Sequence, residues 1–179
     1  MGFRPHLKIG LVALSVLTAA ATFSVGGRVA WAAATLIDVF QDWSAFKDTE
    51  KGKLVCTAGS VAVKSEGKYT SRGDVLIQVT HRQADKTVGV VSIQAGYTYK
   101  SGSEVTVTIG GQTFKLFTDA GHAWAFDDKG DKALVAAMKG GADMIVKGTS
   151  SRDTLTTDTF SLNGFTAAYT AISQACGIK

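Results

Sequence analysis

Residues 104–118 read E-V-T-V-T-I-G-G-Q-T-F-K-L-F-T, and this stretch decides the fold class. Valine and isoleucine alternate with threonine from Glu104 to Ile109, so one face of the segment is apolar and the other is polar. That alternation is the period of a β-strand. Gly110-Gly111 then interrupts the pattern, and a second strand-like run follows from Gln112 to Thr118. Two glycines between such runs suit a tight turn, so the stretch predicts an antiparallel hairpin.

Strand-like patterns extend toward the N-terminus from this hairpin. Asp74–Arg82 reads D-V-L-I-Q-V-T-H-R, and Val88–Ala95 continues as V-G-V-V-S-I-Q-A. Both runs are rich in the β-branched residues that pack well on a pleated surface. Further short strands are expected at residues 36–46, 53–63 and 122–126.

Beyond residue 128 the period changes. Lys129–Lys139 is expected to form a helix that ends at Gly140-Gly141, because glycine commonly follows a helix. Residues 143–148 and 154–162 return to strand and predict a second hairpin, with its turn at Ser151–Asp153. A final helix is expected over Phe165–Ala175.

The final helix should bury one face. Phe165, Ala168, Tyr169, Ile172 and Cys176 recur every three or four residues, which places them on one side of a helix. Roughly nine short strands with glycine turns, together with two short helices, predict one mainly β domain, an antiparallel β-sandwich. A closed barrel is the competing architecture.

The first 32 residues have the pattern of a secretory signal peptide. Arg4 and Lys8 precede an apolar run from Ile9 to Val25, and Ala30-Trp31-Ala32 offers small residues at alternate positions. We expect cleavage after Ala32, within a residue or two, which leaves a domain of residues 33–179 without a stable membrane span. The alternative is an uncleaved membrane anchor, for which the run of 17 residues is at the lower limit of length. Cleavage would place the protein in the periplasm or outside the cell. Association with the outer membrane is compatible with either location.

Loss of the leader changes the charge balance. The whole chain carries 19 basic and 15 acidic residues, and three of the basic residues lie within residues 1–32. The mature chain therefore has 16 basic and 15 acidic residues. The numbers of basic and acidic residues are nearly equal, and the sequence shows no stripe of basic residues. We therefore do not expect the protein to bind nucleic acid in general.

Cys56 and Cys176 both remain after cleavage. An even count in an oxidising compartment predicts one disulfide, which would attach the final helix to the early strands. Two free buried thiols and a catalytic cysteine are the alternatives, and no local pattern places a base beside either cysteine.

Several stretches resemble the invasion-associated locus B family of envelope proteins of Gram-negative bacteria, over roughly residues 40–179. They are S-E-G-K-Y-T-S-R-G-D-V at 65–75, A-G-Y-T-Y at 95–99, F-K-L-F-T-D at 114–119, K-G-T-S-S-R-D-T-L-T-T-D-T-F-S-L at 147–162, N-G-F-T-A-A at 163–168, and Cys176. The resemblance implies an exported immunoglobulin-like β-sandwich and a link to host-cell entry in pathogenic members, and it does not imply an enzyme.

The chain departs from the family pattern at two places. Thr57 follows the first cysteine where tyrosine is usual, and Val61-Ala62 stands in place of a glutamine-proline pair. Asp153 occupies a position that is usually glycine. If that turn needs a positive φ, aspartate tolerates it less well than glycine.

Five residues form the candidate interaction surface. Arg72-Gly73-Asp74 spells a tripeptide of integrin ligands, although Gly73 more simply bends the chain into a strand and Arg72 and Asp74 can pair with neighbours. Tyr97 and Tyr99 are expected on one strand face, as a stacking surface or as core. Arg152 is the expected anchor of the hydroxyl-rich segment 150–158.

The histidines, the acidic residues near position 128, the tryptophans and the serines do not indicate a catalytic or metal-binding site. His81 and His122 lack further ligands at metal-binding spacing. Asp127, Asp128 and Asp131 fit a helix start rather than a calcium loop. Trp43 and Trp124 are expected in the core, and no glycine-serine-glycine elbow accompanies the serines.

These observations predict a non-enzymatic envelope protein that binds an unknown envelope or host protein and carries no cofactor or metal. Strand addition at a sheet edge is one mode of binding for such a fold. The alternatives are a small periplasmic hydrolase, which requires His81 or His122 within hydrogen-bond reach of a serine or carboxylate, and an assembly factor for the envelope. The sequence does not indicate the oligomeric state.

Overall fold

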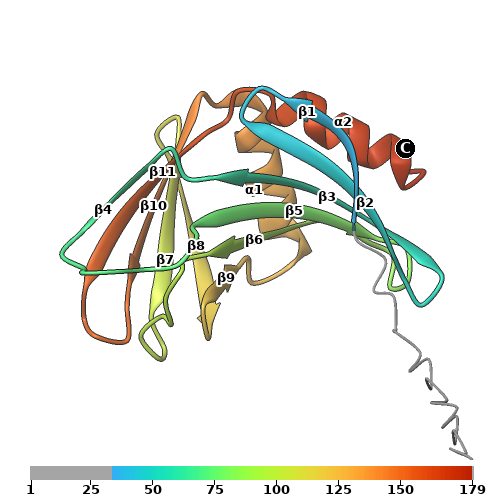
Figure 1. The fold of residues 1–179 in the computed structure, drawn as a ribbon. Coiled ribbons are helices and arrows are strands. Elements are labelled where there is room, and N and C mark those ends of the chain that lie inside the picture. The colour runs from blue at the N-terminus through green and yellow to red at the C-terminus, as the bar shows by residue number, and fades with distance from the viewer. Residues whose placement is uncertain (1–33, 179) are drawn as a thin grey trace, which may run out of the picture. The chain divides into compact units, whose positions relative to one another are not determined.

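The computed structural model describes residues 34–178, and Figure 1 shows that they form a curved antiparallel sheet with two helices packed on it. The leader, its cleavage site and the predicted domain boundary at residue 33 lie outside the described residues. In chain order the strands are β1 (Thr35–Phe40), β2 (Trp43–Glu50), β3 (Lys53–Val61), β4 (Lys64–Gly67), β5 (Leu76–Arg82), β6 (Thr87–Gln94), β7 (Glu104–Ile109), β8 (Gln112–Asp119), β9 (His122–Trp124), β10 (Asp143–Thr149) and β11 (Leu155–Ser161). The helices are α1 (Asp128–Gly140) and α2 (Phe165–Ala175).

All of these strands belong to one sheet in the order β1-β2-β3-β5-β6-β9-β8-β7-β10-β11-β4. Figure 1 shows that the strands β1, β2, β3, β5 and β6 run in a different direction from the strands β9, β8, β7, β10, β11 and β4. The inward-facing side chains of both halves form one hydrophobic cluster, so the sheet makes a sandwich-like arrangement. The predicted class is confirmed: the fold is mainly β, with a short internal helix and a C-terminal helix.

The chain passes from one half of the sheet to the other within two residues. The amide of Ala62, which follows β3, donates to the Val75 carbonyl at 3.0 Å, next to β5. The amide of Val63 then donates to the Thr159 carbonyl in β11 at 2.8 Å. As a result the segment from β4 back to β5 lies against β11, and it carries residues 68–72 over that end of the sheet.

Both predicted hairpins are confirmed. Gly110 and Gly111 have φ angles of 52° and 84°, and Ile109 pairs with Gln112 across the turn. The turn between β10 and β11 falls at Ser151–Asp153, and Asp153 has a φ of 60°. The position that is usually glycine in the family therefore does adopt the left-handed conformation.

Two details of the strand prediction are wrong. The expected strand over residues 36–46 is a hairpin, because the chain turns at Gln41, whose φ is 53°, and starts β2 at Trp43. The turn contains neither glycine nor proline, and the pair Gln41-Asp42 was its one local sign. The strand β4 was not predicted, because its sequence K-S-E-G is exposed throughout and has no apolar alternation.

Helix α1 begins as its sequence indicates. The Asp127 carboxylate caps the helix by accepting from the Gly130 amide at 2.8 Å. Asp131 is buried and accepts from the Val91 amide in β6 at 2.9 Å. These contacts account for Asp127 and Asp131, and Asp128 lies in the first turn of the helix. Within residues 34–178 no group of three or more metal-ligating side chains converges.

Helix α2 spans the residues predicted for it and packs on the first strands. Phe165, Ala168 and Ile172 are buried, and the Phe165 ring lies 4.7 Å from the Trp43 ring, centroid to centroid. Cys176 at the end of α2 forms a disulfide with Cys56 in β3, and the two Cα atoms lie 6.0 Å apart. The predicted disulfide is therefore confirmed, and it closes a loop across 120 residues.

Across the described part of the chain, neither helix has the length and apolar character that crossing a lipid bilayer would require.

Candidate functional site

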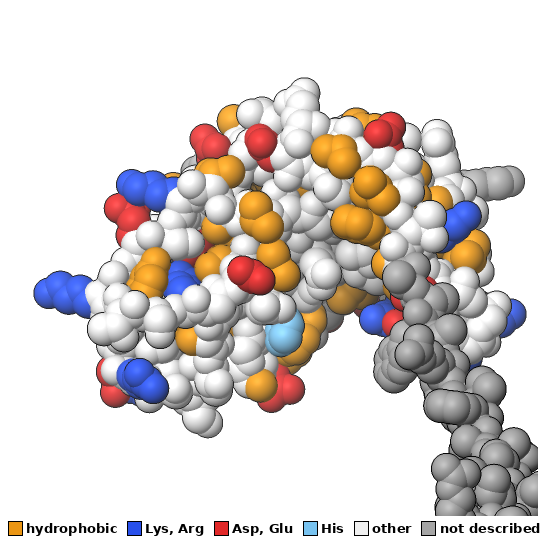
Figure 2. All heavy atoms as spheres, in the orientation of Figure 1, with side chains coloured by type: hydrophobic (Ala, Val, Ile, Leu, Met, Phe, Trp, Pro, Cys, Tyr) orange, Lys and Arg blue, Asp and Glu red, His pale blue; other side chains and the backbone are white. Residues whose placement is uncertain are grey.

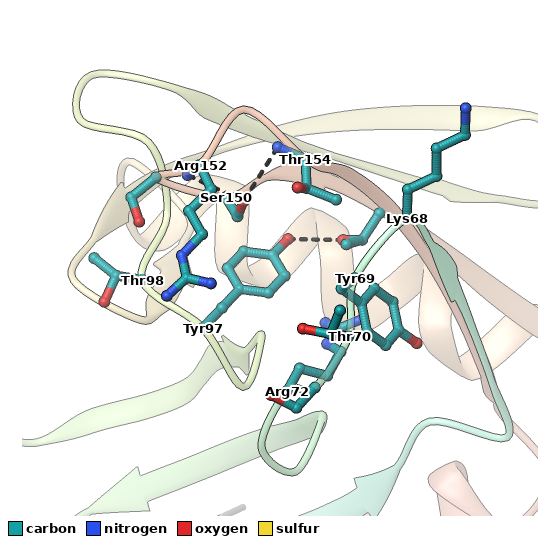
Figure 3. Close-up of a pocket in the computed structure, with 12 residues that line it drawn as sticks. Lys68, Tyr69, Thr70, Arg72, Tyr97, Thr98, Ser150, Arg152 and Thr154 are labelled. Carbon is teal, nitrogen blue, oxygen red and sulfur yellow. Dashed lines mark hydrogen bonds between the residues drawn. The ribbon is translucent and has the colours of Figure 1, made fainter.

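A cavity of about 490 Å³ opens where three connecting segments meet at the β10–β11 end of the sheet. Its walls are residues 68–72 between β4 and β5, Tyr97 and Thr98 after β6, and Ser150, Ser151, Arg152, Thr154 and Thr156 of the β10–β11 hairpin. Figure 3 shows these side chains around the opening, and we call it the groove. Its volume lies in the range of about 300–1,000 Å³ that is usual for small-molecule sites.

The floor of the groove is a buried ion pair. Arg72 donates to both carboxylate oxygens of Asp158, at 2.8 and 3.0 Å, and the two side chains are 5% and 4% exposed. Arg72 also donates to the Ala95 carbonyl through Nε at 3.0 Å and through a second guanidinium nitrogen. Burial alone would lower the pKa of Arg72, but the hydrogen bonds and the charge of Asp158 outweigh it and raise that pKa.

Two tyrosines lie against this guanidinium. The Arg72 Cζ atom is 5.2 Å from the centroid of the Tyr69 ring and 4.9 Å from that of Tyr97, so cation–π attraction adds to the ion pair. The Tyr97 hydroxyl hydrogen-bonds the Thr156 hydroxyl at 2.7 Å. Burial raises the pKa of Tyr97, so this phenol stays protonated at neutral pH. The floor therefore holds two aromatic rings in fixed positions at the groove.

Tyr99 does not reach the groove. It is 4% exposed, and its ring meets that of Tyr97 edge to face at 5.2 Å. Gly148 in β10 makes room for both rings, since a Cβ at this position would lie 2.6 Å from the Tyr99 ring and 3.1 Å from the Tyr97 hydroxyl. Tyr99 is core, and Tyr97 is the tyrosine that faces the opening.

The β10–β11 hairpin brings Arg152 to the rim. The Ser150 hydroxyl accepts from the amides of Arg152 and Thr154, at 3.2 Å each, which holds the loop closed on itself. Lys100 pairs with Asp153 on the outer side of the loop. Arg152 is exposed, and its guanidinium has no carboxylate partner among residues 34–178.

The structure brings together three of the five predicted surface residues, namely Arg72, Tyr97 and Arg152. Asp74 is exposed but lies outside the groove, where its carbonyl accepts from Gln94. Because the guanidinium of Arg72 is buried in its ion pair, the tripeptide it begins is not an exposed integrin-type ligand.

Sequence reasoning missed Lys68, Tyr69 and Asp158. A tyrosine in an otherwise polar stretch was the one available sign of Tyr69. The inward position of Asp158 follows from the alternation of β11, once the pairing of that strand is known.

The sequence profile of the family described as invasion associated locus B (IalB) protein matches residues 43–173, well over half of the chain. The chain belongs to this family. Among solved structures it is similar to the crystal structure of invasion associated protein B from Bartonella henselae, with 20% identity and a TM-score of 0.54 over 77% of this chain and 95% of that one. At this identity the likeness concerns the fold. Comparison with curated proteins finds no match.

One histidine of this IalB-family chain does lie beside a serine. His81 Nε2 is 3.1 Å from the Ser173 hydroxyl, the distance that the hydrolase alternative requires. His81 Nδ1 accepts from the Gly89 amide at 2.9 Å, so Nδ1 carries no proton and the neutral ring must carry its proton on Nε2. Nε2 therefore donates to Ser173 and cannot remove a proton from it.

The surroundings of His81 also oppose catalysis. The side chain is fully buried, and neither His81 nor Ser173 lines the groove. Burial, with a smaller contribution from the charge of Lys139, lowers the pKa of His81 to about 4. The Ser173 hydroxyl donates to the Tyr169 carbonyl at 2.8 Å. This pair is a structural contact that seats α2 on β5.

The prediction that Trp124 belongs to the core is wrong, while Trp43 is fully buried as predicted. Trp124 is half-buried on the outer face of β9, where it stacks on His122 at 5.4 Å and lies 5.8 Å from Phe117. It points outward because Ala123 takes the buried position of this three-residue strand. Figure 2 shows scattered apolar side chains on the face it displays.

Proposed function

We propose that this IalB-family protein is an exported, non-enzymatic binding module of the cell envelope and that the groove is the surface that contacts its partner. The observation that carries the proposal is the groove itself. A buried ion pair fixes Tyr69 and Tyr97, and Arg152 stands beside them with an open guanidinium. Fixed aromatic rings beside an unpaired arginine are the residue types that concentrate binding energy at interfaces.

Two features support export. The leader has the pattern of a signal peptide, and a disulfide persists in oxidising compartments such as the periplasm. The structural neighbour from Bartonella henselae is named an invasion associated protein, which is compatible with a partner on the envelope or on a host cell.

The tautomer of His81 supports the non-enzymatic part of the proposal. In the described residues its proton is on the nitrogen that faces Ser173, so the ring cannot act as a base toward that serine. The contact between His81 and Ser173 therefore gives the hydrolase alternative no support.

Site-specific crosslinking in intact cells tests the proposal. A photoreactive amino acid at Ser151 places the probe in the groove, and the same amino acid at Ala133, exposed on α1, is the matched control. We expect a discrete adduct in the envelope fraction from position 151 and none from position 133, identified by mass spectrometry. Equal labelling from both positions would show that the groove is not the contact surface. An intact N-terminal methionine on soluble cytosolic protein would refute export, and adducts with nascent outer-membrane proteins would favour an assembly factor.

A further inference from the structure

Beyond contact with a partner, the groove has a chemistry that points to one class of ligand. Three of its lining residues are cationic, namely Lys68, Arg72 and Arg152, and none is acidic. Asp158 neutralises Arg72 from below. Lys68 and Arg152 have no such partner in the part of the chain that the structure describes. The opening therefore carries uncompensated positive charge, which favours an anionic group.

Arg152 is placed to use that charge. Figure 3 shows its side chain descending from the hairpin toward the Tyr97 ring, whereas Lys68 on the other side extends its amine away from that ring. The Ser150 hydroxyl fixes the backbone of the hairpin through the amides of Arg152 and Thr154. A guanidinium presented from a fixed loop can donate two parallel hydrogen bonds to one carboxylate or phosphate.

The remaining lining of the groove is hydroxylated. Thr70, Ser71, Thr98 and Ser151 line it, and their hydroxyls have no protein partner within residues 34–178. Each of these groups can both donate and accept. Several such groups around one small cavity match a ligand that is itself rich in hydroxyls.

The aromatic wall fits the same ligand. One side of Tyr69 lies against the Arg72 guanidinium, and 37% of the residue remains exposed at the groove. A sugar ring presents a face of C–H groups that packs on an aromatic ring while its hydroxyls stay hydrogen-bonded. The groove has no aliphatic lining residue, so it offers no anchor for the apolar side chain of a peptide.

We infer that the groove binds an acidic saccharide. Its carboxylate or phosphate would lie on Arg152, its ring on Tyr69, and its hydroxyls among Thr70, Ser71 and Thr98. This inference rests on the proposed binding function and names the chemistry that the groove recognises.

Titration calorimetry on the protein purified from the envelope fraction tests the inference with three probes, namely sodium glucuronate, methyl glucoside and inorganic phosphate. We expect glucuronate to bind at least about tenfold more tightly than the neutral glucoside, because a charge-assisted hydrogen bond is worth about that factor. Its affinity should fall as sodium chloride is raised. Phosphate alone should bind more weakly than glucuronate, because it lacks the ring and hydroxyls.

The Arg152→Gln variant should lose at least about tenfold in glucuronate affinity, while Lys132→Gln, which removes the same charge on α1, should leave it unchanged. Equal losses in both variants, tighter binding of phosphate, or stronger binding of a glutamate-rich peptide would each overturn the saccharide assignment. If glucuronate does not bind while crosslinks from Ser151 still capture an envelope partner, the ligand class is wrong and the proposed binding function stands. If glucuronate binds and no crosslink forms, the partner role is wrong instead.

Discussion

Two buried polar clusters in this domain differ in what lies above them. Arg72 and Asp158 are charged, and their ion pair forms the floor of an open groove. His81 and Ser173 are neutral; His81 is fully buried under helix α2, and Ser173 is the half-buried α2 residue that contacts it. Both clusters satisfy their polar atoms, so both are compatible with a stable core.

The difference shows which cluster serves function. The sealed cluster joins α2 to β5 next to the disulfide, and its whole effect is on stability. The charged cluster is more costly to bury, because two charges lose their hydration. What it provides is the fixed position of Tyr69 and Tyr97 at the surface. We call the contacts between helix α2 and the sheet the α2 side, and the groove with its ion pair the groove side. The comparison predicts that substitutions on the α2 side alter stability alone, and that substitutions on the groove side alter both stability and binding.

The disulfide should have the largest effect, on the α2 side. Replacing Cys56 and Cys176 by serine removes a link across 120 residues. In the chain-entropy model we expect the free energy of unfolding to fall by about 4–5 kcal/mol, measured by urea denaturation. Glucuronate affinity should persist wherever the variant is folded. As a control, a reductant should not shift the urea midpoint of the double variant, because that variant has no disulfide to reduce. A loss of unfolding free energy below about 1 kcal/mol in the double variant would contradict the predicted role of the disulfide.

Arg72→Ala should be nearly as severe, on the groove side. It leaves the Asp158 carboxylate buried without a partner, which costs about 3–5 kcal/mol. The paired variant Arg72→Met with Asp158→Leu should recover most of that loss, because no charge is then left unpaired. It should still bind glucuronate poorly, since the tyrosines lose the guanidinium between them. Full binding by the paired variant would show that the ion pair has no positioning role.

Acid should weaken the α2 side through His81. Its pKa is about 4 in the folded protein and about 6.5 in the unfolded chain, so between these values the unfolded state binds more protons. Stability contributed by neutral His81 is therefore fully present above pH 6.5 and is lost as the pH falls toward 4, by up to about 3 kcal/mol.

Urea denaturation across this pH range, with NMR titration of the His81 ring, measures the effect. Burial raises the pKa of Asp131, which acts in the opposite direction, so the series should be repeated in Asp131→Asn. A His81 ring that titrates near 6.5 in the folded protein would contradict the lowering of its pKa by burial.

The smallest effect is expected at Asp153 in the groove hairpin. Its φ of 60° strains any residue with a Cβ, although aspartate tolerates this conformation better than most. Asp153→Ala should destabilise the domain by about 1 kcal/mol, and Asp153→Gly should change stability by less than about 0.5 kcal/mol, because relief of strain is offset by greater freedom of the unfolded chain. Thermal denaturation distinguishes the two. The Lys100→Ala variant is the control, because it removes the exposed ion pair with Asp153 and leaves the turn unchanged. If it lost as much stability as Asp153→Ala, the effect would come from the ion pair and not from the backbone.

Much of this fold could be predicted because its signals are local. Gly110-Gly111 supplies positive φ angles wherever the strands end up, and the apolar repeat of α2 identifies its buried face without knowledge of the partner. The turn at Gln41 could not be predicted, because ordinary residues adopt a positive φ there under the constraint of the neighbouring strands.

The groove was predictable only in part. Arg72, Tyr97 and Arg152 were identified as candidate residues from their types and from short motifs. Nothing in the sequence indicated that Arg72 would pair with Asp158, 86 residues away, or which of Tyr97 and Tyr99 would be buried and which would reach the groove.

The sequence by itself determined the secondary structure class, the single possible pairing of the two cysteines beyond the leader, and the buried face of the final helix. These depend on residue periodicity and on the small number of cysteines. Tertiary structure alone decided the order of the strands, the passage from β3 to β4, and hence which charges meet beneath the groove. The reason is that a charge is attracted by any opposite charge, so its partner is selected only when sheet pairing brings distant segments side by side.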